Sequence, residues 1–158
     1  MQACQQVRYY KDNALFILKL SGSVRFTCTH YLELALKQVN KKNDIIFDMT
    51  SAKYLDSTIM GSIAKHFLQA KKKPIVVYKD EDIKLMFSKI GFDQFFTFTQ
   101  NDERINVKDE SFKQIEIFNE DENAKALKEY VLKAHATLSK MHPQDDSFKN
   151  VVKLLKDK

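Results

Sequence analysis

The chain has little glycine, proline or cysteine, and each shortage excludes a class of protein. Its 158 residues include three glycines and two prolines, too few for a linker or a low-complexity segment. Three glycines can hardly build a backbone cradle for nucleotide phosphates, and neither a P-loop nor a dinucleotide-binding fingerprint is present. The two cysteines, Cys4 and Cys28, form neither a disulfide framework nor a metal-binding pattern. We therefore interpret both as structural or incidental thiols.

Long hydrophobic runs are also missing from the sequence. The longest uninterrupted apolar run covers residues 14–18, whereas a membrane-spanning helix needs roughly 20 apolar residues. Residues 1–6 have neither the basic nor the apolar region of a signal peptide. We therefore expect a soluble cytoplasmic protein without membrane insertion. The hydrophobic fraction of 44% is enough for a core, and the length fits one domain with an appendage.

No side-chain pattern typical of an enzyme or a metal site is present. The four histidines are His30, His66, His135 and His142. No two of them lie within four residues of each other, so the local spacing predicts no metal-binding pair. The G-x-S-x-G motif of serine hydrolases is missing, and the paired carboxylates at positions 81–82 and 145–146 lie at predicted helix starts, where they stabilise the helix dipole. We therefore expect no enzymatic activity, no metal and no cofactor.

The basic charge balance raises the question of nucleic-acid binding. The chain has 26 Lys and Arg against 21 Asp and Glu, a net charge of +5. Its one lysine run, residues 71–73, lies between a predicted helix and a predicted strand. Cations are favourable at the C-terminus of a helix, which is a sufficient explanation of the run. We therefore expect no direct binding of DNA or RNA.

The first hundred residues alternate predicted strands and helices. Apolar runs predict strands at residues 5–10, 14–20, 45–49, 75–78 and 95–98. Apolar residues at helical spacing predict helices at residues 29–39, 57–70 and 81–90. Residues 50–55 are predicted to form a loop. Strands that alternate with helices indicate an α/β domain with a largely parallel sheet.

The remainder of the chain has a different pattern. Residues 101–122 are polar and irregular, apart from an apolar stretch at 115–118 that is compatible with a short strand. Residues 123–158 predict two amphipathic helices separated by a break at 141–144. A helical hairpin of this size is too small to fold alone, so it must pack on the first domain, on a second copy or on a partner. We therefore divide the chain into a domain at 1–100, a connection and a C-terminal hairpin.

The stretch with the most functional information follows the third predicted strand. There the strand ends, the chain turns, and Ser57 and Thr58 stand where a helix begins. Asp, Ser and Thr are common at helix N-termini for structural reasons alone, and that is one interpretation. The other is a switch, because phosphorylation of a hydroxyl would place about −1.5 to −2 charges on an exposed helix start.

Several motifs together support a resemblance to a known family. Asp-Met-Thr-Ser at positions 48–51 follows the central strand, and Tyr-Leu-Asp-Ser-Thr-Ile-Met-Gly occupies positions 54–61. Further along, Leu-Met-Phe at 85–87 is followed by Ile-Gly-Phe-Asp at 90–93. With these motifs, residues 6–98 resemble a STAS domain (sulphate transporter and anti-sigma-factor antagonist). The resemblance implies the STAS fold, a small mixed, mostly parallel sheet of about four to five strands with helices packed mainly on one side.

The same resemblance implies a function. In stand-alone members, a dedicated serine kinase phosphorylates the serine that follows the aspartate. The unphosphorylated form binds that kinase or anti-sigma factor and releases a sigma factor, and a serine phosphatase resets the switch. The implied role is an anti-sigma-factor antagonist in a bacterial partner-switching pathway, with Ser57 as phosphoacceptor, Thr58 as its backup and Asp56 orienting the hydroxyl or contacting the partner. The implied partner-contact residues are Asp56, Ser57, Thr58, Ile59, Met60 and Arg25.

Two other hypotheses remain open. STAS domains also serve as constitutive structural subunits that brace an ATPase in lipid-transport complexes, and an intact Asp-Ser pair favours the switch without excluding the brace. A nucleotide-binding or small-ligand-binding STAS module is disfavoured by the few glycines.

Arg25 stands where the family often has an acidic residue, which bears on the identity of the partner. The tail resembles a helical extension of some proteobacterial antagonists, and it would cover an apolar face, select the partner or mediate a homodimer.

Overall fold

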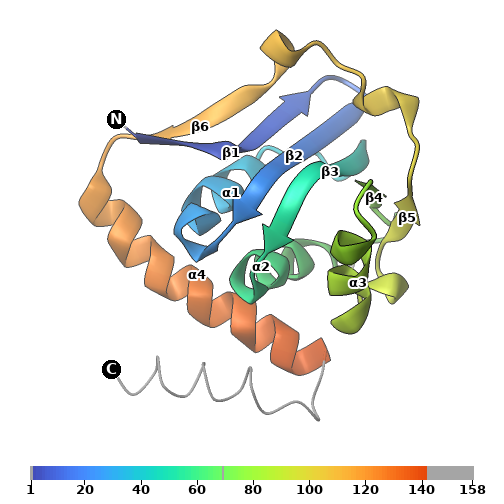
Figure 1. Cartoon of the computed structure of the whole chain (residues 1–158). Helices are drawn as coiled ribbons and strands as arrows, with labels where there is room; N and C mark the ends of the chain where they lie inside the picture. The colour runs from blue at the N-terminus through green and yellow to red at the C-terminus, as the bar shows by residue number, and fades with distance from the viewer. Residues whose placement is uncertain (1, 69, 142–158) are drawn as a thin grey trace.

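Six strands form one mixed sheet within residues 2–68 and 70–141, which the computed structural model describes (Figure 1). The strands are β1 (Gln2–Lys11), β2 (Leu15–Val24), β3 (Asp44–Leu55), β4 (Ile75–Tyr78), β5 (Thr97–Thr99) and β6 (Lys113–Ile117). Their order in the sheet is β5-β4-β3-β2-β1-β6. Strands β2 to β5 are parallel, and β1 is antiparallel to both of its neighbours. The mostly parallel STAS-type fold predicted from the sequence is confirmed, with six strands in place of four or five.

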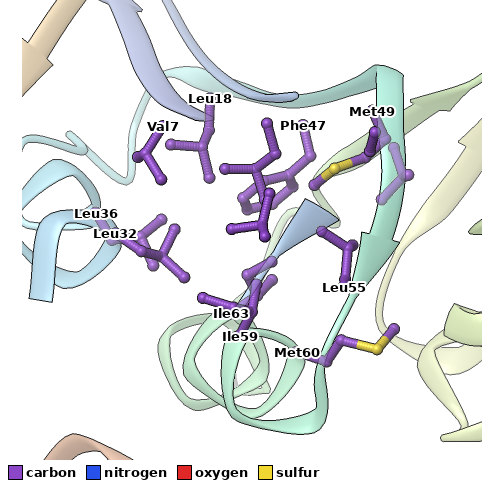
Figure 2. Packing of buried hydrophobic residues seen from close by; sticks show 14 of the residues in the cluster. Val7, Leu18, Leu32, Leu36, Phe47, Met49, Leu55, Ile59, Met60 and Ile63 are labelled. Carbon is purple, nitrogen blue, oxygen red and sulfur yellow. The ribbon is translucent and has the colours of Figure 1, made fainter. Parts of the chain in front are cut away.

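The helices cover one face of this sheet. They are α1 (Thr29–Leu36), α2 (Ser57–Phe67), α3 (Glu81–Lys89) and α4 (Glu120–Met141). Leu32 of α1, Ile63 of α2 and Phe87 of α3 are fully buried in one cluster with Leu18 and Phe47 of the sheet. Figure 2 shows side chains of α1 and α2 pointing toward those of β2 and β3. Each such buried side chain stabilises the fold by about 1.5–3 kcal/mol, so this cluster fixes α2 against the sheet.

The opposite face of the sheet is covered by the connection between β5 and β6. Ile17, Ile46 and Val77 are fully buried on that face. The side chains that pack against them from the connection are Ile105, Val107 and Phe112. The connection is irregular, with two 3-10 turns, Glu103–Ile105 and Asp109–Ser111. Its apolar stretch forms edge strand β6, which pairs with β1.

Strand β3 is longer than the sequence predicts. Residues 50–55, expected to form a loop, continue the strand to Leu55, because β2 also continues to Val24 and pairs with β3 in parallel. The register of this pair shifts twice. One shift lies next to Gly22, whose φ of 70° falls in the left-handed region that favours glycine. Pairing with a long neighbour therefore overrides the local polarity of these residues.

Cys4 and Cys28 form a disulfide, so their interpretation as separate thiols is wrong. Cys4 lies on β1, and Cys28 ends the 3-10 turn η1 (Phe26–Cys28). Their Cα atoms are 6.2 Å apart, a normal separation for a disulfide. The two residues are 24 positions apart in the sequence, and only the hairpin of β1 and β2 brings them together. Disulfides are rare in the cytosol, so this bond and the expected cytoplasmic location point in opposite directions.

The described part of the C-terminal extension is the single helix α4. It packs on α1 and α2, and Figure 1 shows it crossing the outer side of both. This is the first of the three positions expected for the extension. The second predicted helix, residues 148–155, lies outside the described residues. Among the helices that the structure describes, not one combines the length and the apolar character needed to cross a membrane.

Candidate switch site at the start of helix α2

The turn from β3 into α2 is built around Asp56. Its backbone is extended, with φ −80° and ψ 172°, and Ser57 is the first helical residue. The Asp56 carboxylate accepts a hydrogen bond from the Ile59 N–H at 3.0 Å. This is the N-cap arrangement, in which a side chain satisfies one of the free N–H groups of the first helical turn. The Asp-Ser-Thr motif therefore has, at least in part, the structural role of a helix N-cap.

Asp56 also ties α2 to the turn before α1. Its second carboxylate oxygen accepts a hydrogen bond from the Phe26 N–H at 2.5 Å, and its own N–H donates to the Val24 carbonyl at 3.2 Å. Both carboxylate oxygens thus bind main-chain N–H groups, one in each of two segments. In the structure, the Asp56 carboxylate therefore does not orient the Ser57 hydroxyl, which was one of its two expected roles. The aspartate positions the backbone, and another residue positions the hydroxyl.

That residue is His135 of α4. Its Nε2 atom lies 2.9 Å from the Ser57 Oγ, and its Nδ1 atom lies 2.9 Å from the Val131 carbonyl oxygen. A carbonyl oxygen only accepts, so Nδ1 carries the hydrogen, and Nε2 of the neutral ring accepts from the Ser57 hydroxyl. The Val131 carbonyl thereby favours the neutral tautomer in which the Ser57 hydroxyl is the donor.

Sequence reasoning did not identify His135 as a site residue. It lies 78 residues from Ser57, and it is 5% exposed, on the buried side of α4 with Ala134 and Leu138. A serine bonded to a histidine also occurs in hydrolase triads, where a carboxylate faces the other ring nitrogen. Here Nδ1 faces a main-chain carbonyl instead, and the histidine is almost fully covered. The pair is better suited to holding α4 on α2 than to catalysis.

The residues that follow Ser57 do not form an exposed surface in this arrangement. Thr58 and Met60 are each 4% exposed and Ile59 is fully buried. Figure 2 shows Ile59 beside Ile63 in the core. Their predicted contact with a partner would need a rearrangement of α2 or α4, and Thr58 is poorly placed as a backup phosphoacceptor. These three residues are buried because α2 lies between the sheet and α4.

Exposed side chains next to the turn come from the neighbouring loops. Phe26 is 47% exposed and Tyr54 is 38% exposed. The exposed Arg25 places its guanidinium carbon 4.9 Å from the centre of the Tyr54 ring, a cation–π contact. The half-buried Ser57 lies close to these three residues, because its neighbour Asp56 accepts a hydrogen bond from the Phe26 N–H. We call Arg25, Phe26 and Tyr54 the aromatic patch. Arg25 was predicted as a partner contact, and the two aromatic residues were missed.

A buried ion-pair cluster joins α1 to the last turn of α2, at the opposite end of that helix from Ser57. Glu33 is 1% exposed, and its two carboxylate oxygens lie 2.7 Å from Lys65 Nζ and 2.7 Å from His66 Nε2. Burial raises the pKa of Glu33, but the hydrogen bonds from His66 and Lys65 outweigh burial and hold that pKa below its ordinary value. The cluster clamps the two helices together. In residues 2–68 and 70–141, no group of three or more His, Cys, Asp or Glu side chains could hold a metal ion.

Comparison with known protein families identifies the family of this chain. The profile of the STAS domain family matches residues 6–104, more than half of the chain. The match ends before β6 and α4, so the helix that covers Ser57 lies outside it. No curated protein sequence matches the chain. The chain therefore belongs to the STAS domain family.

Proposed function

We propose that this chain is a regulatory protein-binding module, an anti-sigma-factor antagonist in a partner-switching pathway, switched by reversible phosphorylation of Ser57. The observation that carries the proposal is the position of the Ser57 hydroxyl in the first turn of α2, half-buried and next to an exposed aromatic patch. A phosphate there would meet free main-chain N–H groups and the positive end of the helix dipole. The domain could therefore carry the charge without unfolding.

Phosphorylation of Ser57 would change its contact with His135. The hydroxyl loses its hydrogen to become an ester oxygen, so it can no longer donate to Nε2. The phosphate adds about −1.5 to −2 charges beside a buried ring nitrogen that also accepts hydrogen bonds. Movement of α4 away from Ser57 would relieve this unfavourable contact. The phosphorylation state of Ser57 is thereby coupled to the position of α4.

The partner would bind over Ser57 and the aromatic patch. Tyr and Arg are enriched among the residues that dominate binding energy at protein interfaces. The patch offers both, with Phe26 47% exposed beside them. Burial of an unpaired phosphate in such an interface costs several kcal/mol, and each 1.4 kcal/mol changes affinity about tenfold. One phosphate is therefore sufficient to release the partner.

A second function is favoured by a different observation. The Ser57 hydroxyl is bonded to His135, and Thr58, Ile59 and Met60 are covered. A serine held in this way also suits a constitutive structural subunit, such as one that braces an ATPase in a lipid-transport complex. In that case, the same contact would lock α4 onto α2 permanently.

The two functions are separated by the proteins that co-purify with the chain. We would recover tagged wild type, Ser57→Ala and Ser57→Asp from the native cells and quantify the bound proteins by mass spectrometry. The switch predicts a serine kinase or anti-sigma factor with Ser57→Ala and its loss with Ser57→Asp. An ATPase and a permease recovered equally with all three forms would overturn the switch in favour of the brace. Asp80→Ala, at the start of α3, serves as a control for a changed helix start elsewhere.

A further inference from the structure

A basic cavity lies at the other end of α2 from the switch site. Its volume is about 650 Å³, and it opens between the end of α2, the start of β3 and the last turns of α4. The lysines that line it are Lys41, Lys65, Lys71, Lys72, Lys73 and Lys140. No carboxylate is among its described lining residues. A cavity whose charged lining side chains are all lysines carries a positive potential.

The lysines come from separate parts of the chain. Lys41 precedes β3, Lys65 belongs to α2, residues 71–73 connect α2 to β4, and Lys140 is in the last turn of α4. The preference of a helix C-terminus for cations explains the lysines that flank the end of α2 and Lys140 in the last turn of α4. It does not explain Lys41, nor why separate elements bring their lysines to one cavity. The sequence interpretation of residues 71–73 as helix-end decoration is therefore incomplete.

Few carboxylates offset this charge. Lys65 pairs with Glu33, and Lys72 pairs with Asp44, which also pairs with Arg104. The other four lysines of the cavity form no ion pair with a described residue. Like charges held within a small volume repel one another. A bound anion would relieve that repulsion.

The size and walls of the cavity indicate the class of anion. Small-molecule sites occupy about 300–1,000 Å³, so a space of about 650 Å³ suits an organic molecule better than a single ion. Apolar side chains, Ile45, Phe67 and Pro74, form part of its wall, with the His66 ring among them. Lysine ammonium groups bind phosphate as point charges and need no glycine-rich backbone. The lack of glycine therefore does not argue against this kind of phosphate site.

We propose that this cavity binds a small phosphorylated organic anion with two or more phosphate groups. The lysines face a concave space rather than forming an extended stripe, which favours a compact ligand over DNA or RNA. The ligand could be a free metabolite or the headgroup of a phosphorylated lipid, since both present the same chemistry. The site is independent of Ser57 and of the proposed function.

The test uses isothermal titration calorimetry on the full chain at physiological ionic strength. The probes are fructose 1,6-bisphosphate and inositol hexakisphosphate, with inorganic sulfate as the control for nonspecific charge. We expect saturable binding of at least one probe with a Kd below about 100 μM. The double substitution Lys73→Gln/Lys140→Gln should weaken it at least about tenfold. Both side chains are exposed and without a described ion pair, so the fold should survive.

A matched variant and two further probes complete the test. Lys11→Gln/Lys128→Gln removes the same charge from two exposed lysines outside the cavity and should leave the Kd unchanged. Phosphatidylcholine vesicles with phosphatidylinositol 4,5-bisphosphate separate the two sources, because binding that depends on Lys73 and Lys140 would identify a lipid headgroup. Absence of saturable binding to every phosphorylated probe would overturn the proposal. Equal weakening by both double variants, or tighter lysine-dependent binding of duplex DNA, would also overturn it.

Discussion

Gly61 of α2 and Ala134 of α4 approach so closely that a Cβ atom at position 61 would overlap the Ala134 carbonyl. Gly61 is four residues after Ser57, and Ala134 immediately precedes His135. Residues four apart lie on the same face of a helix, so the close approach and the Ser57–His135 hydrogen bond belong to one interface. That interface joins the STAS domain to its C-terminal extension at the switch site.

Gly61→Ala should displace α4 from α2. The added methyl group meets main-chain atoms, which cannot move aside as a flexible side chain can. Overpacking of this kind costs about 1–3 kcal/mol. We expect faster hydrogen exchange of the α4 amides around Ala134 and a lower free energy of unfolding. The control is Ser62→Ala, which removes a buried hydroxyl that makes no hydrogen bond within the described residues. Equal exchange of α4 in both variants would show that the close contact does not hold the helix.

His135→Ala should uncouple α4 from Ser57. The substitution removes the acceptor of the Ser57 hydroxyl and leaves a cavity in the interface. We expect a several-fold rise in the phosphorylated fraction of Ser57 in native cells, because the hydroxyl and the first turn of α2 become accessible. His30→Ala is the control, since the hydrogen bond of His30 goes to Asn123 near the start of α4 and not to the Ser57 hydroxyl, which is bonded to His135. An unchanged phosphorylated fraction would remove α4 from the regulation of the site.

Asp56 should be more important for stability than an ordinary N-cap. Asp56→Ala loses the bonds from both Ile59 and Phe26, whereas Asp56→Asn keeps one oxygen as an acceptor. We expect losses of about 2–3 kcal/mol for alanine and about 1 kcal/mol for asparagine. Urea unfolding measures both. The reference is Asp80→Ala at the start of α3, where the carboxylate accepts a single hydrogen bond, from the Asp82 N–H, and a loss of about 1 kcal/mol is expected. Identical losses at positions 56 and 80 would contradict the double role.

Glu33 should make folding sensitive to acid. Its pKa is lowered in the folded protein, because the bonds from His66 and Lys65 outweigh burial. A lowered folded pKa adds stability above the ordinary carboxyl pKa, and that stability is lost as the pH falls through the folded value. We therefore expect Glu33→Gln to be less stable than wild type at pH 7 by about 2–3 kcal/mol. The difference should shrink toward pH 3.

The measurement for Glu33 is urea unfolding from pH 7 to pH 3. Glu116→Gln is the control, because Glu116 is exposed and forms no ion pair with a described residue. Its unfolding free energy should follow the wild-type pH profile. A constant gap between wild type and Glu33→Gln across this range would contradict the account of the buried cluster.

The sequence predicted the parts of the fold that depend on local pattern. The apolar runs marked the central strands, and Asp56 and Ser57 marked the start of α2, because capping acts over three residues. The glycine at position 61 is visible in the sequence, but the reason why a larger residue would not fit there is not. That reason lies in α4, more than 70 residues later. Contacts of this kind depend on tertiary packing and leave no local signal.

Other features could not be predicted from the sequence for the same reason. His135 resembles any residue on the buried side of an amphipathic helix until α4 is docked. Lys41 and Lys140 are ordinary surface lysines in the sequence, and only the fold brings them to one cavity. The end of β3 is polar and was predicted as a loop, because its pairing with β2 is nonlocal. The sequence thus singled out Ser57 from a local motif, and the structure supplied what surrounds it.

The most direct test of the switch is peptide-level mass spectrometry of the protein from its native cells, covering residues 54–65. Phosphate on Ser57 in part of the pool, with none on the buried Thr58, is the result that we predict. Absence of phosphate from Ser57 under every growth condition would contradict the switch and leave the structural subunit as the function of this chain.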